Sequence, residues 1–477
     1  MSLSELRQRL DCGEISAVEL TKSYLDKIEE KDKSINSYIT VCRQAALRQS
    51  ENAQKRIAKK EADFLTGIPL SVKDNICTAG IKTTCASKML SDFVPIYNAT
   101  VVEKLIKKDA VIIGKTNLDE FAMGSTNESS YFGAVKNPIN TEYVPGGSSG
   151  GAAAGVAAGL CAAALATDTG GSIRQPASFC GVTGFKPTYG SVSRYGLIAF
   201  ASSLDTIGFL TNSAEDCAYL MNGVAGEDKR DSTTSPLANR DYTAFLGCSL
   251  KGTKIGIPME FFGEDLSPEV KNAVQKAAEF FKSCGAELID VSLKSLEIAP
   301  DIYRIISSAE ACSNLSRYDG MKYGHTSKIN ADYNERTALS RSEGFSEEVK
   351  KRIVFGTYVL SSDNYDNYYK KALYLRQCIK DDYEKIFKQC DMVLTPTVSS
   401  AAFKFTEKTE KILHSHTADK YTLTANLAGL PSISTTCGYD KSNMPLGMCL
   451  TGKHFDDARI IAAADIFERE FKNTRIT

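Results

Sequence analysis

Two glycine-rich turns, separated by a run of small apolar residues, are the feature that most constrains how this chain folds. The first is GGSSGG at Gly146–Gly151, and the second is DTGGS at Asp168–Ser172. Glycine loses more backbone entropy on folding than other residues, so such clusters are favoured where the chain needs positive φ or where a ligand approaches main-chain N–H groups. Both turns also carry serine. The pattern favours a catalytic site in which serine hydroxyls lie beside backbone N–H groups that can bind a developing anion.

Flexible loops and a phosphate-binding loop are the alternatives for these turns. Glycine and serine are common in loops, but here the apolar segment Ala152–Thr167 joins the two turns, which argues against simple linkers. A phosphate loop requires GxxxxGK[ST]. The Gly-Lys-Thr at Gly114–Thr116 has Asp109 where the first glycine should stand, so we reject the phosphate loop.

A serine nucleophile needs a base, because its hydroxyl is a weak nucleophile at neutral pH. Histidine is the usual base, and the chain has four, none beside a glycine turn: His325, His414, His416 and His454. Residues of a triad meet only in space, so distance in sequence does not exclude a histidine. Lysine is the other known partner of a catalytic serine.

Lys73 stands out among the lysines. It follows Ile68–Val72, which is typical of a short buried strand, and precedes a turn at Asp74–Asn75. To act as a base near pH 7 it needs a pKa lowered by roughly three units from about 10.4, a shift that burial can produce. A lysine that reaches solvent or pairs with Asp74 is the commoner outcome. Composition and spacing alone leave Lys73 as one candidate among many.

The two turns and several further blocks resemble the amidase signature family. The matching blocks cover much of the first 190 residues: Gly67–Asn75, Gly114–Gly124, Gly146–Ser178 and Phe185–Gly190. The resemblance implies a single large α/β domain and a Ser-Ser-Lys triad. By the same resemblance Ser172 is the nucleophile, Ser148 the proton relay and Lys73 the base.

The family resemblance also implies details of the backbone. It implies a cis peptide at Gly147–Ser148 and an oxyanion hole formed by the N–H groups of four consecutive residues, Thr169, Gly170, Gly171 and Ser172. Ser149 is the main rival to Ser148, and only the resemblance separates the two serines. Composition shows neither feature.

Later segments resemble one branch of the family, the A subunits of the glutamyl-tRNA(Gln) and aspartyl-tRNA(Asn) amidotransferases. These segments are Ser191–Asp205, Ala309–Gly320, Glu348–Ser362 and Thr424–Pro431. The resemblance implies a glutaminase that hydrolyses free glutamine and supplies ammonia, for making Gln-tRNA(Gln) and possibly Asn-tRNA(Asn). It implies a B subunit that uses ATP and Mg²⁺ and contacts the tRNA, a small C subunit, and no cofactor in this chain.

Three residues match positions where that branch holds glutamine, namely Tyr303, Arg352 and Asp419. The chemistry agrees, because an arginine suits the α-carboxylate of glutamine and a carboxylate suits its α-ammonium group. For each residue alone, an ordinary surface charge is the commoner role. The chain departs from the branch at Lys420, at Thr424 and at Met448–Leu450, near the rim of the expected pocket.

Composition places the chain among globular proteins. A formal net charge of −1 gives no basic footprint for nucleic acid, so RNA contact is expected from a partner. The charged N-terminus lacks a signal peptide's apolar region, and Gly150–Ala166 is too short and too rich in small residues for a membrane span, so we expect a cytoplasmic protein. The fourteen cysteines lack metal-site spacing and are expected to be reduced; a metal site at His414 and His416 is not expected.

Periodicity predicts strands alternating with helices, and hence an α/β fold with a mixed, largely parallel sheet covered by helices on both faces. Strands are expected at 68–72, 110–114, 254–257 and 392–394, and helices at 3–10, 16–31, 39–60, 267–284, 365–388 and 456–471. We expect one domain over 1–477, with N-terminal helices in 1–62, a catalytic core in 63–225, a mostly helical cap in about 292–388 and a return to the core in 389–477.

Two other functions remain open on the sequence alone. A self-sufficient amidase acting on a small or fatty amide would turn over rapidly without partners and without dependence on Arg352. A non-catalytic binding module would keep the glycine turns as scaffolding. The presence of Lys73, Ser148 and Ser172 together argues against the binding module.

Overall fold

A single sheet organises the chain in the computed structural model, which describes residues 1–405 and 420–476. Its order is β1-β3-β2-β4-β6-β5-β10-β11-β9-β7-β8. The strands are β1 Tyr38–Val41, β2 Pro69–Lys73, β3 Val111–Thr116, β4 Ala163–Asp168, β5 Thr183–Lys186, β6 Thr206–Thr211, β7 Lys254–Pro258, β8 Glu287–Val291, β9 Met392–Pro396, β10 Ser432–Tyr439 and β11 Pro445–Gly452. The predicted α/β class is therefore confirmed.

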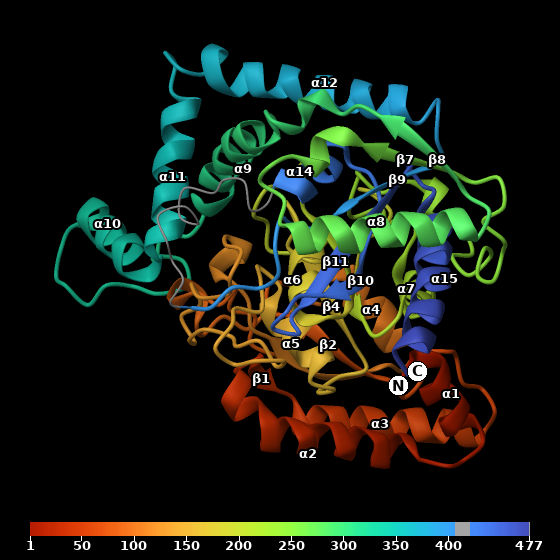
Figure 1. The fold of residues 1–477 in the computed structure, drawn as a ribbon. Helices are drawn as coiled ribbons and strands as arrows, with labels where there is room; N and C mark the ends of the chain where they lie inside the picture. Colours follow the sequence, from red (N-terminus) through yellow and green to blue (C-terminus); the bar gives the residue numbers. More distant parts are fainter. Residues whose placement is uncertain (406–419, 477) are drawn as a thin grey trace.

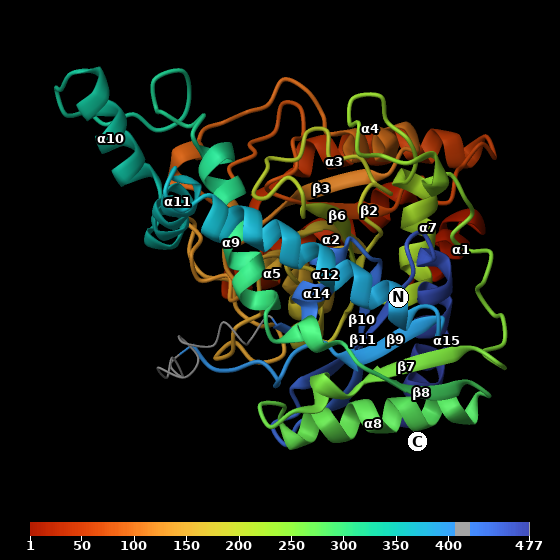
Figure 2. The ribbon, with the colours of Figure 1, turned by 90° about the horizontal axis from the view of Figure 1, so that it is seen from above.

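Helices surround this sheet (Figure 1). They are α1 Leu3–Asp11, α2 Ala17–Ile35, α3 Arg43–Ala58, α4 Thr100–Lys107, α5 Gly150–Ala157, α6 Arg174–Cys180, α7 Ala214–Val224, α8 Pro268–Ser283, α9 Ala299–Leu315, α10 Tyr333–Gly344, α11 Glu347–Leu360, α12 Lys371–Ile386, α14 Lys420–Ala428 and α15 Asp457–Ile476. At the β7–β11 end, α8 lies on one side of the sheet while α12 and α14 lie on the other (Figure 2).

The pairing of the strands is less parallel than the sequence suggests. β2 pairs in parallel with β3 and β4, and β7 with β8 and β9. The pairs β1–β3, β4–β6, β5–β6, β5–β10, β10–β11 and β9–β11 are antiparallel. Short apolar runs do not reveal strand direction, so sequence periodicity could not predict this arrangement.

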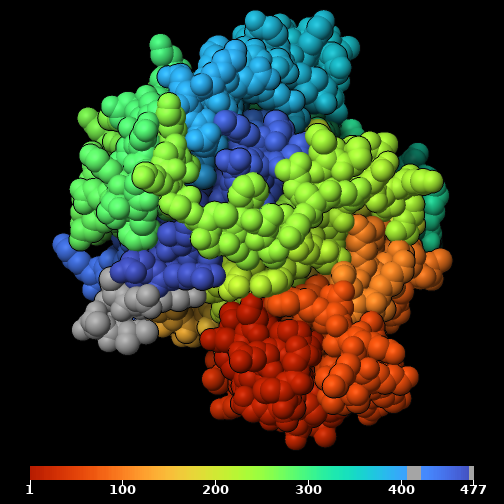
Figure 3. Space-filling view, turned by 90° about the vertical axis from the view of Figure 1, so that its right-hand side faces the viewer, coloured from red at the N-terminus to blue at the C-terminus, as the bar shows by residue number. Residues whose placement is uncertain are grey.

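Local sequence signals explain where several helices begin. The hydroxyls of Ser2 and Ser16 accept a hydrogen bond from the backbone N–H of Glu5 and Glu19, the third residues of α1 and α2. The side chains of these glutamates in turn accept a hydrogen bond from the backbone N–H of Ser2 and Ser16. These capping boxes satisfy N–H groups that the first turn of a helix leaves unpaired. α2 and α3 pack on each other and on β2 and β3. The first residues form a lobe at the bottom of the space-filling view (Figure 3).

One predicted helix is wrong in part, and the small-residue segment contains both a helix and a strand. The segment predicted as a helix over 39–60 begins as strand β1, because Tyr38–Val41 pairs with the edge of β3 before α3 starts at Arg43. The small-residue segment after the first glycine turn is also divided: α5 ends at Ala157, Gly159 turns the chain at φ 68°, and the rest forms β4.

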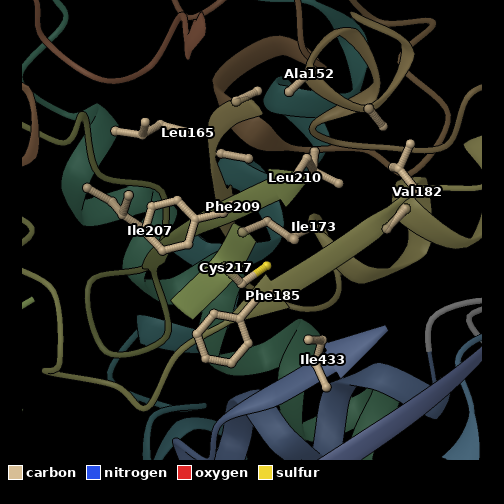
Figure 4. Close-up of a cluster of buried hydrophobic side chains, with 14 of the residues drawn as sticks. Ala152, Leu165, Ile173, Val182, Phe185, Ile207, Phe209, Leu210, Cys217 and Ile433 are labelled. Carbon is tan, nitrogen blue, oxygen red and sulfur yellow. The ribbon is translucent and has the colours of Figure 1, made fainter. Parts of the chain in front are cut away.

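The core lies where β4, β5 and β6 meet α5, α6 and α7. Figure 4 shows Leu165, Phe185 and Phe209 from the strands in one cluster of buried side chains with Cys217 of α7, while Ile173 packs on the other face of the sheet against Gly184 and Gly208. Every residue of β4 and β6 is buried, which explains why these strands consist almost entirely of small and apolar residues. The two glycine-rich turns border this core, because the first leads into α5 and the second connects β4 to α6.

The cap expected at 292–388 is mostly helical and contains α9, α10, α11 and α12. α11 packs along α9, and α12 packs on α9 and α14. α10 projects away from the body of the molecule in both ribbon views (Figures 1 and 2). Residues of α9 and α11 line one part of a cavity.

Candidate active site

Lys73 is the last residue of β2, and the sheet buries it completely. Its Nζ lies 2.9 Å from Ser148 Oγ, 2.8 Å from Ser149 Oγ and 2.9 Å from Thr167 Oγ1. Burial lowers the pKa of Lys73 to about 7, although nearby carboxylates, Asp119 first among them, act in the opposite direction. An amine with this pKa is partly neutral at physiological pH and can accept a proton.

The first glycine turn brings the two serines to Lys73. The Gly147–Ser148 peptide is cis, which agrees with the family resemblance. The Gly147 N–H donates to Gln175 Oε1 at 2.9 Å. A Cβ at Gly147 would lie 2.1 Å from Asp119 Oδ2, so the turn packs too closely on this carboxylate for any other residue. The GGSSGG sequence is thus required by close packing as well as by backbone conformation.

The second glycine turn is held by a buried ion pair. Asp168 ends β4 and binds Arg174 through two hydrogen bonds, Nε to Oδ2 at 3.0 Å and Nη2 to Oδ1 at 3.1 Å. The N–H groups of Gly171 and Ile173 donate to the same carboxylate at 2.8 and 3.2 Å. Burial alone would raise the pKa of Asp168, but Arg174 outweighs it and lowers that pKa to about 2. The turn around Ser172 is therefore held by the Asp168 carboxylate, which is ionised at neutral pH.

The hydrogen bond of Gly171 changes the expected oxyanion hole. Its N–H group donates to Asp168 Oδ1, so this donor is already used. Within residues 1–405 and 420–476, the N–H groups of Gly170 and Ser172 make no hydrogen bond. Thr169 is fixed by its hydroxyl, which donates to Asp205 at 2.8 Å. The geometry favours Gly170 and Ser172 over Gly171 as anion-binding donors.

The two glycine turns are joined directly. The N–H of Ser149 donates to the carbonyl of Ser172 at 3.2 Å. Ser148 and Ser149 are fully buried, whereas Ser172 keeps 8% of its surface exposed. Of the three serines, Ser172 is the one that lines the adjoining cavity. Within the described residues no hydrogen bond joins the Ser148 and Ser172 hydroxyls, so the structure places Lys73 in direct contact with Ser148 and places Ser172 at the cavity beside them.

The cavity has a volume of about 690 Å³ and two contrasting walls. Gly170, Gly171 and Ser172 form the catalytic wall. The opposite wall, which we call the helical wall, comes from α9 and α11 and carries Tyr303, Arg304, Glu348, Lys351 and Arg352. The sequence therefore identified residues on both sides of one cavity.

Tyr303 and Arg352 both line the cavity, and Tyr303 meets the second glycine turn. A Cβ at Gly170 would lie 2.7 Å from the Tyr303 ring, so the ring packs directly on the second turn. Arg352 Nε donates to Glu348 at 2.8 Å, and its guanidinium lies 5.7 Å from the centre of the Phe200 ring. Asp419, the third predicted glutamine ligand, lies outside the described residues, as do His414 and His416.

Sequence analysis missed several residues that hold the site. Asp119 accepts hydrogen bonds from Asn127 N and Ser129 Oγ at 2.9 and 2.8 Å, and burial raises its pKa to about 6. Thr422 donates to the Gly170 carbonyl at 2.6 Å, and its own carbonyl accepts from Arg174 at 3.1 Å. Asp119 lies in the family block Gly114–Gly124, which was one available signal; Thr422 had none.

Comparison with known proteins identifies the family. The sequence model of the amidase family, described as "Amidase", matches residues 19–461. The chain belongs to the amidase family.

Individual relatives cover the chain almost completely. The glutamyl-tRNA(Gln) amidotransferase A subunit of Caldanaerobacter subterraneus is 52% identical over 99% of this chain and 96% of its own length. The crystal structure of the corresponding A subunit from Thermotoga maritima superposes with a TM-score of 0.79 at 36% identity, over 98% of this chain and 94% of that one. A peptide amidase from Stenotrophomonas maltophilia superposes with a TM-score of 0.83 at 27% identity, over 99% and 97% of the two chains.

The described residues also bear on metal binding and on membrane insertion. Among the residues that the structure describes, no three His, Cys, Asp or Glu side chains are grouped so that they could bind a metal ion. No helix of the described chain is long and apolar enough to cross a membrane.

Proposed function

We propose that this chain is the glutamine-hydrolysing component of a tRNA-dependent amidotransferase. The observation that carries the proposal is the buried Lys73–Ser148 contact next to Ser172, in a chain whose full length matches A-subunit relatives at about half identity. By this proposal the chain hydrolyses the side-chain amide of glutamine and supplies ammonia for converting Glu-tRNA(Gln) to Gln-tRNA(Gln), and for Asp-tRNA(Asn) where the complex accepts it.

The reaction begins with proton transfer through the two serines. Neutral Lys73 takes the proton of Ser148, Ser148 takes the proton of Ser172, and Ser172 Oγ forms a bond to the carboxamide carbon. The tetrahedral intermediate collapses with a proton delivered back through Ser148 to the nitrogen, so ammonia leaves. Water then attacks the glutamyl ester of Ser172, and glutamate is released with the enzyme restored.

Stabilisation of the negative oxygen is assigned to the second turn. The N–H groups of Gly170 and Ser172 are the available donors, with Thr169 beside them, while Gly171 instead donates to Asp168. Preorganised N–H donors of this kind stabilise a tetrahedral oxyanion by about 3–4 kcal/mol each. Asp168, Arg174 and Thr422 contribute by holding the turn in this conformation.

Glutamine recognition is assigned to the helical wall. Arg352 binds the α-carboxylate, Asp419 binds the α-ammonium group, and Tyr303 packs between these groups and the second turn. Support comes from the cavity, which brings Tyr303 and Arg352 together with Ser172, and from the chemistry of an amino-acid substrate. Glutamine is small compared with a cavity of about 690 Å³, which leaves a path for ammonia and product.

Partners complete the proposed enzyme. A partner of the B type uses ATP and Mg²⁺ to activate the tRNA-bound carboxylate, amidates it and contacts most of the tRNA, and a small partner of the C type binds this chain. The near-neutral net charge supports tRNA binding by another component of the complex. We place the complex in the cytoplasm, where charged tRNA is used.

Substitution of the nucleophile tests this function. In the complex reconstituted with its B and C subunits, Ser172→Ala should abolish ammonia release from glutamine, while amidation of charged tRNA with added ammonium continues. Ser178→Ala is the control, because Ser178 is a buried serine whose hydroxyl has no hydrogen-bond partner among the described residues. If Ser172→Ala retains glutaminase activity, the nucleophile is another residue.

The same preparation separates the proposed function from a stand-alone amidase. Peptide amidase shares the fold, so this alternative is tested with the purified chain and no partners. Rapid hydrolysis of simple amides that is unaffected by Arg352→Gln would contradict the glutaminase assignment.

A further inference from the structure

Lys73 has three hydroxyl neighbours, although the proton transfer described above uses one. Ser148, Ser149 and Thr167 all lie within 2.9 Å of Nζ. All four side chains are almost completely buried. A neutral amine has two N–H groups and one lone pair, so the three neighbours cannot play the same role.

The hydroxyl hydrogen of Ser149 already takes part in another hydrogen bond. Ser149 Oγ donates to the carbonyl oxygen of Thr167 at 3.1 Å. A hydroxyl has one hydrogen and two lone pairs, so towards Lys73 this oxygen can only accept. Ser149 therefore accepts a hydrogen bond from an N–H of Lys73. It cannot transfer its proton to the amine without losing its hydrogen bond to the Thr167 carbonyl.

Thr167 is held in place from another side. Asn75 Nδ2 donates to Thr167 Oγ1 at 3.0 Å and uses one lone pair of that oxygen. The other lone pair is available to Lys73; because the Thr167 hydroxyl hydrogen has no other acceptor among the described residues, the kinetics below separate its role from that of Ser148. In the part of the chain that the structure describes, Ser148 Oγ makes a hydrogen bond only with Lys73, so its hydrogen has no competing acceptor.

We propose that Ser149 and Thr167 are positioning residues that accept the two N–H groups of neutral Lys73 and thereby direct its lone pair at Ser148. The inference rests on the proposed function, because it takes Lys73 as the base. As Ser172 attacks, the O–H bond of Ser148 breaks, an N–H bond forms on Lys73, and Ser148 receives the proton of Ser172. The resulting ammonium group then donates to all three oxygens, so the same network stabilises it.

This assignment gives the two adjacent serines different tasks for a physical reason. Ser148 carries the mobile proton, and Ser149 holds the base. The distinction follows from the acceptor of each hydroxyl hydrogen, since both oxygens are equally close to Nζ.

Steady-state kinetics of the reconstituted complex test the proposal. Ser149→Ala and Thr167→Val should each lower kcat for glutamine about 10- to 100-fold and leave KM within about twofold, because each removes an acceptor of Lys73 without touching substrate. Thr167→Ser keeps the hydroxyl and should restore most of kcat. Ser178→Ala controls for the loss of a buried hydroxyl, and thermal melting of each variant separates loss of activity from loss of fold.

A double-mutant cycle makes the test specific. Ser148→Ala should lower kcat by about 10³-fold or more, since it removes the relay. In that background Ser149→Ala should add less than about twofold, because both residues act through the same amine. Full additivity would overturn the proposal, and so would wild-type kcat in Ser149→Ala. If Ser149→Ala does not fold, the comparison of Thr167→Val with Thr167→Ser decides.

Other outcomes assign the proton path elsewhere. If Ser148→Ala stays active while Ser149→Ala or Thr167→Val is inactive, the relay runs through that residue and the positioning role is wrong. These results are distinguishable from failure of the proposed function. An active Ser172→Ala variant would contradict the nucleophile itself, whereas an inactive one beside a fully active Ser149→Ala contradicts only the positioning role.

Discussion

The two walls of the cavity are built in opposite ways. Behind the catalytic wall, Lys73, Asp168 and Arg174 support the two glycine turns; all three are completely buried, and each makes several hydrogen bonds. On the helical wall, the side chain of Arg352 keeps 23% of its surface exposed and that of Lys351 keeps 72%. Arg352 pairs with Glu348 one helical turn away.

This difference separates the chemistry from the choice of substrate. Buried charges without partners cost several kcal/mol, so the catalytic wall tolerates little change, whereas exposed pairs on a helix contribute only a few tenths. We therefore expect substitutions behind the catalytic wall to change stability and kcat, and substitutions on the helical wall to change substrate binding.

The largest effect is expected at the base. Lys73→Met keeps the length and apolar packing of the side chain but removes the amine, so kcat for glutamine should fall by about 10⁴-fold, the upper range for loss of a general base. KM should change little, because Lys73 does not line the cavity. Steady-state glutaminase assays measure both constants.

Lys186→Met provides the matched control. Lys186 is equally buried, and burial likewise lowers its pKa to about 7, but its Nζ donates to the Pro187 carbonyl at 2.9 Å and contacts no serine. Activity should therefore remain within a few-fold of wild type. An equal loss in Lys186→Met would show that a buried amine in general, and not the contact with Ser148, is what activity requires.

Asp168→Asn should have the next largest effect, this time on stability. The substitution leaves the buried Arg174 guanidinium without its charged partner, which typically costs about 3–5 kcal/mol. Denaturant unfolding should show this decrease, and glutaminase activity should fall because the turn around Ser172 loses its anchor.

Glu348→Gln is the corresponding change on the helical wall. It breaks an ion pair in which Glu348 keeps 42% of its side chain exposed, so unfolding free energy should change by less than about 0.5 kcal/mol. Equal destabilisation by the two substitutions would contradict the contrast between the walls.

Part of this arrangement follows from the sequence and part does not. The strand that presents Lys73 was predictable, because Ile68–Val72 is apolar and short, and the glycine turns marked Ser148 and Ser172. The anchors of the turns were not predictable. Thr422 reaches Gly170 across 252 residues of sequence, and a polar residue of this kind carries no local pattern that reveals its partner.

The errors in secondary structure have the same physical origin. Tyr38–Val41 has a helical periodicity with the residues that follow, but pairing with β3 provides hydrogen bonds and burial that local preference does not include. In the small-residue segment, alanine favours a helix. Gly159 nevertheless turns the chain, and the second half of the segment pairs with β2 and β6 as strand β4. Tertiary contacts therefore determine the secondary structure of both segments.

Arg352→Gln should affect binding more than catalysis. Loss of a charged hydrogen bond to the substrate carboxylate should raise KM for glutamine about 10- to 100-fold and change kcat little. Lys351→Gln, on the same wall but mostly exposed, is the control and should leave KM within about twofold. A fall in kcat with unchanged KM in Arg352→Gln would place this residue in the chemistry and remove the distinction between the walls.

The last effect expected is the dependence of activity on pH, about tenfold per unit. Burial lowers the pKa of Lys73 to about 7, so below this pH the amine is protonated and has no lone pair for Ser148. kcat/KM should therefore fall about tenfold per unit as pH decreases below 7 and reach a plateau above it. The Arg352→Gln variant should keep this profile, because the helical wall does not contact Lys73.

The temperature dependence of this profile identifies the titrating group. Burial raises the pKa of Asp119 and of Asp205 to about 6, so these carboxyl groups ionise in the same range. Ionisation of an amine absorbs much more heat than ionisation of a carboxyl group, so the midpoint moves to lower pH on warming if Lys73 is responsible and hardly moves if a carboxyl group is. A midpoint independent of temperature would assign the acid limb to Asp119 or Asp205, and Lys73 would then be neutral throughout this pH range.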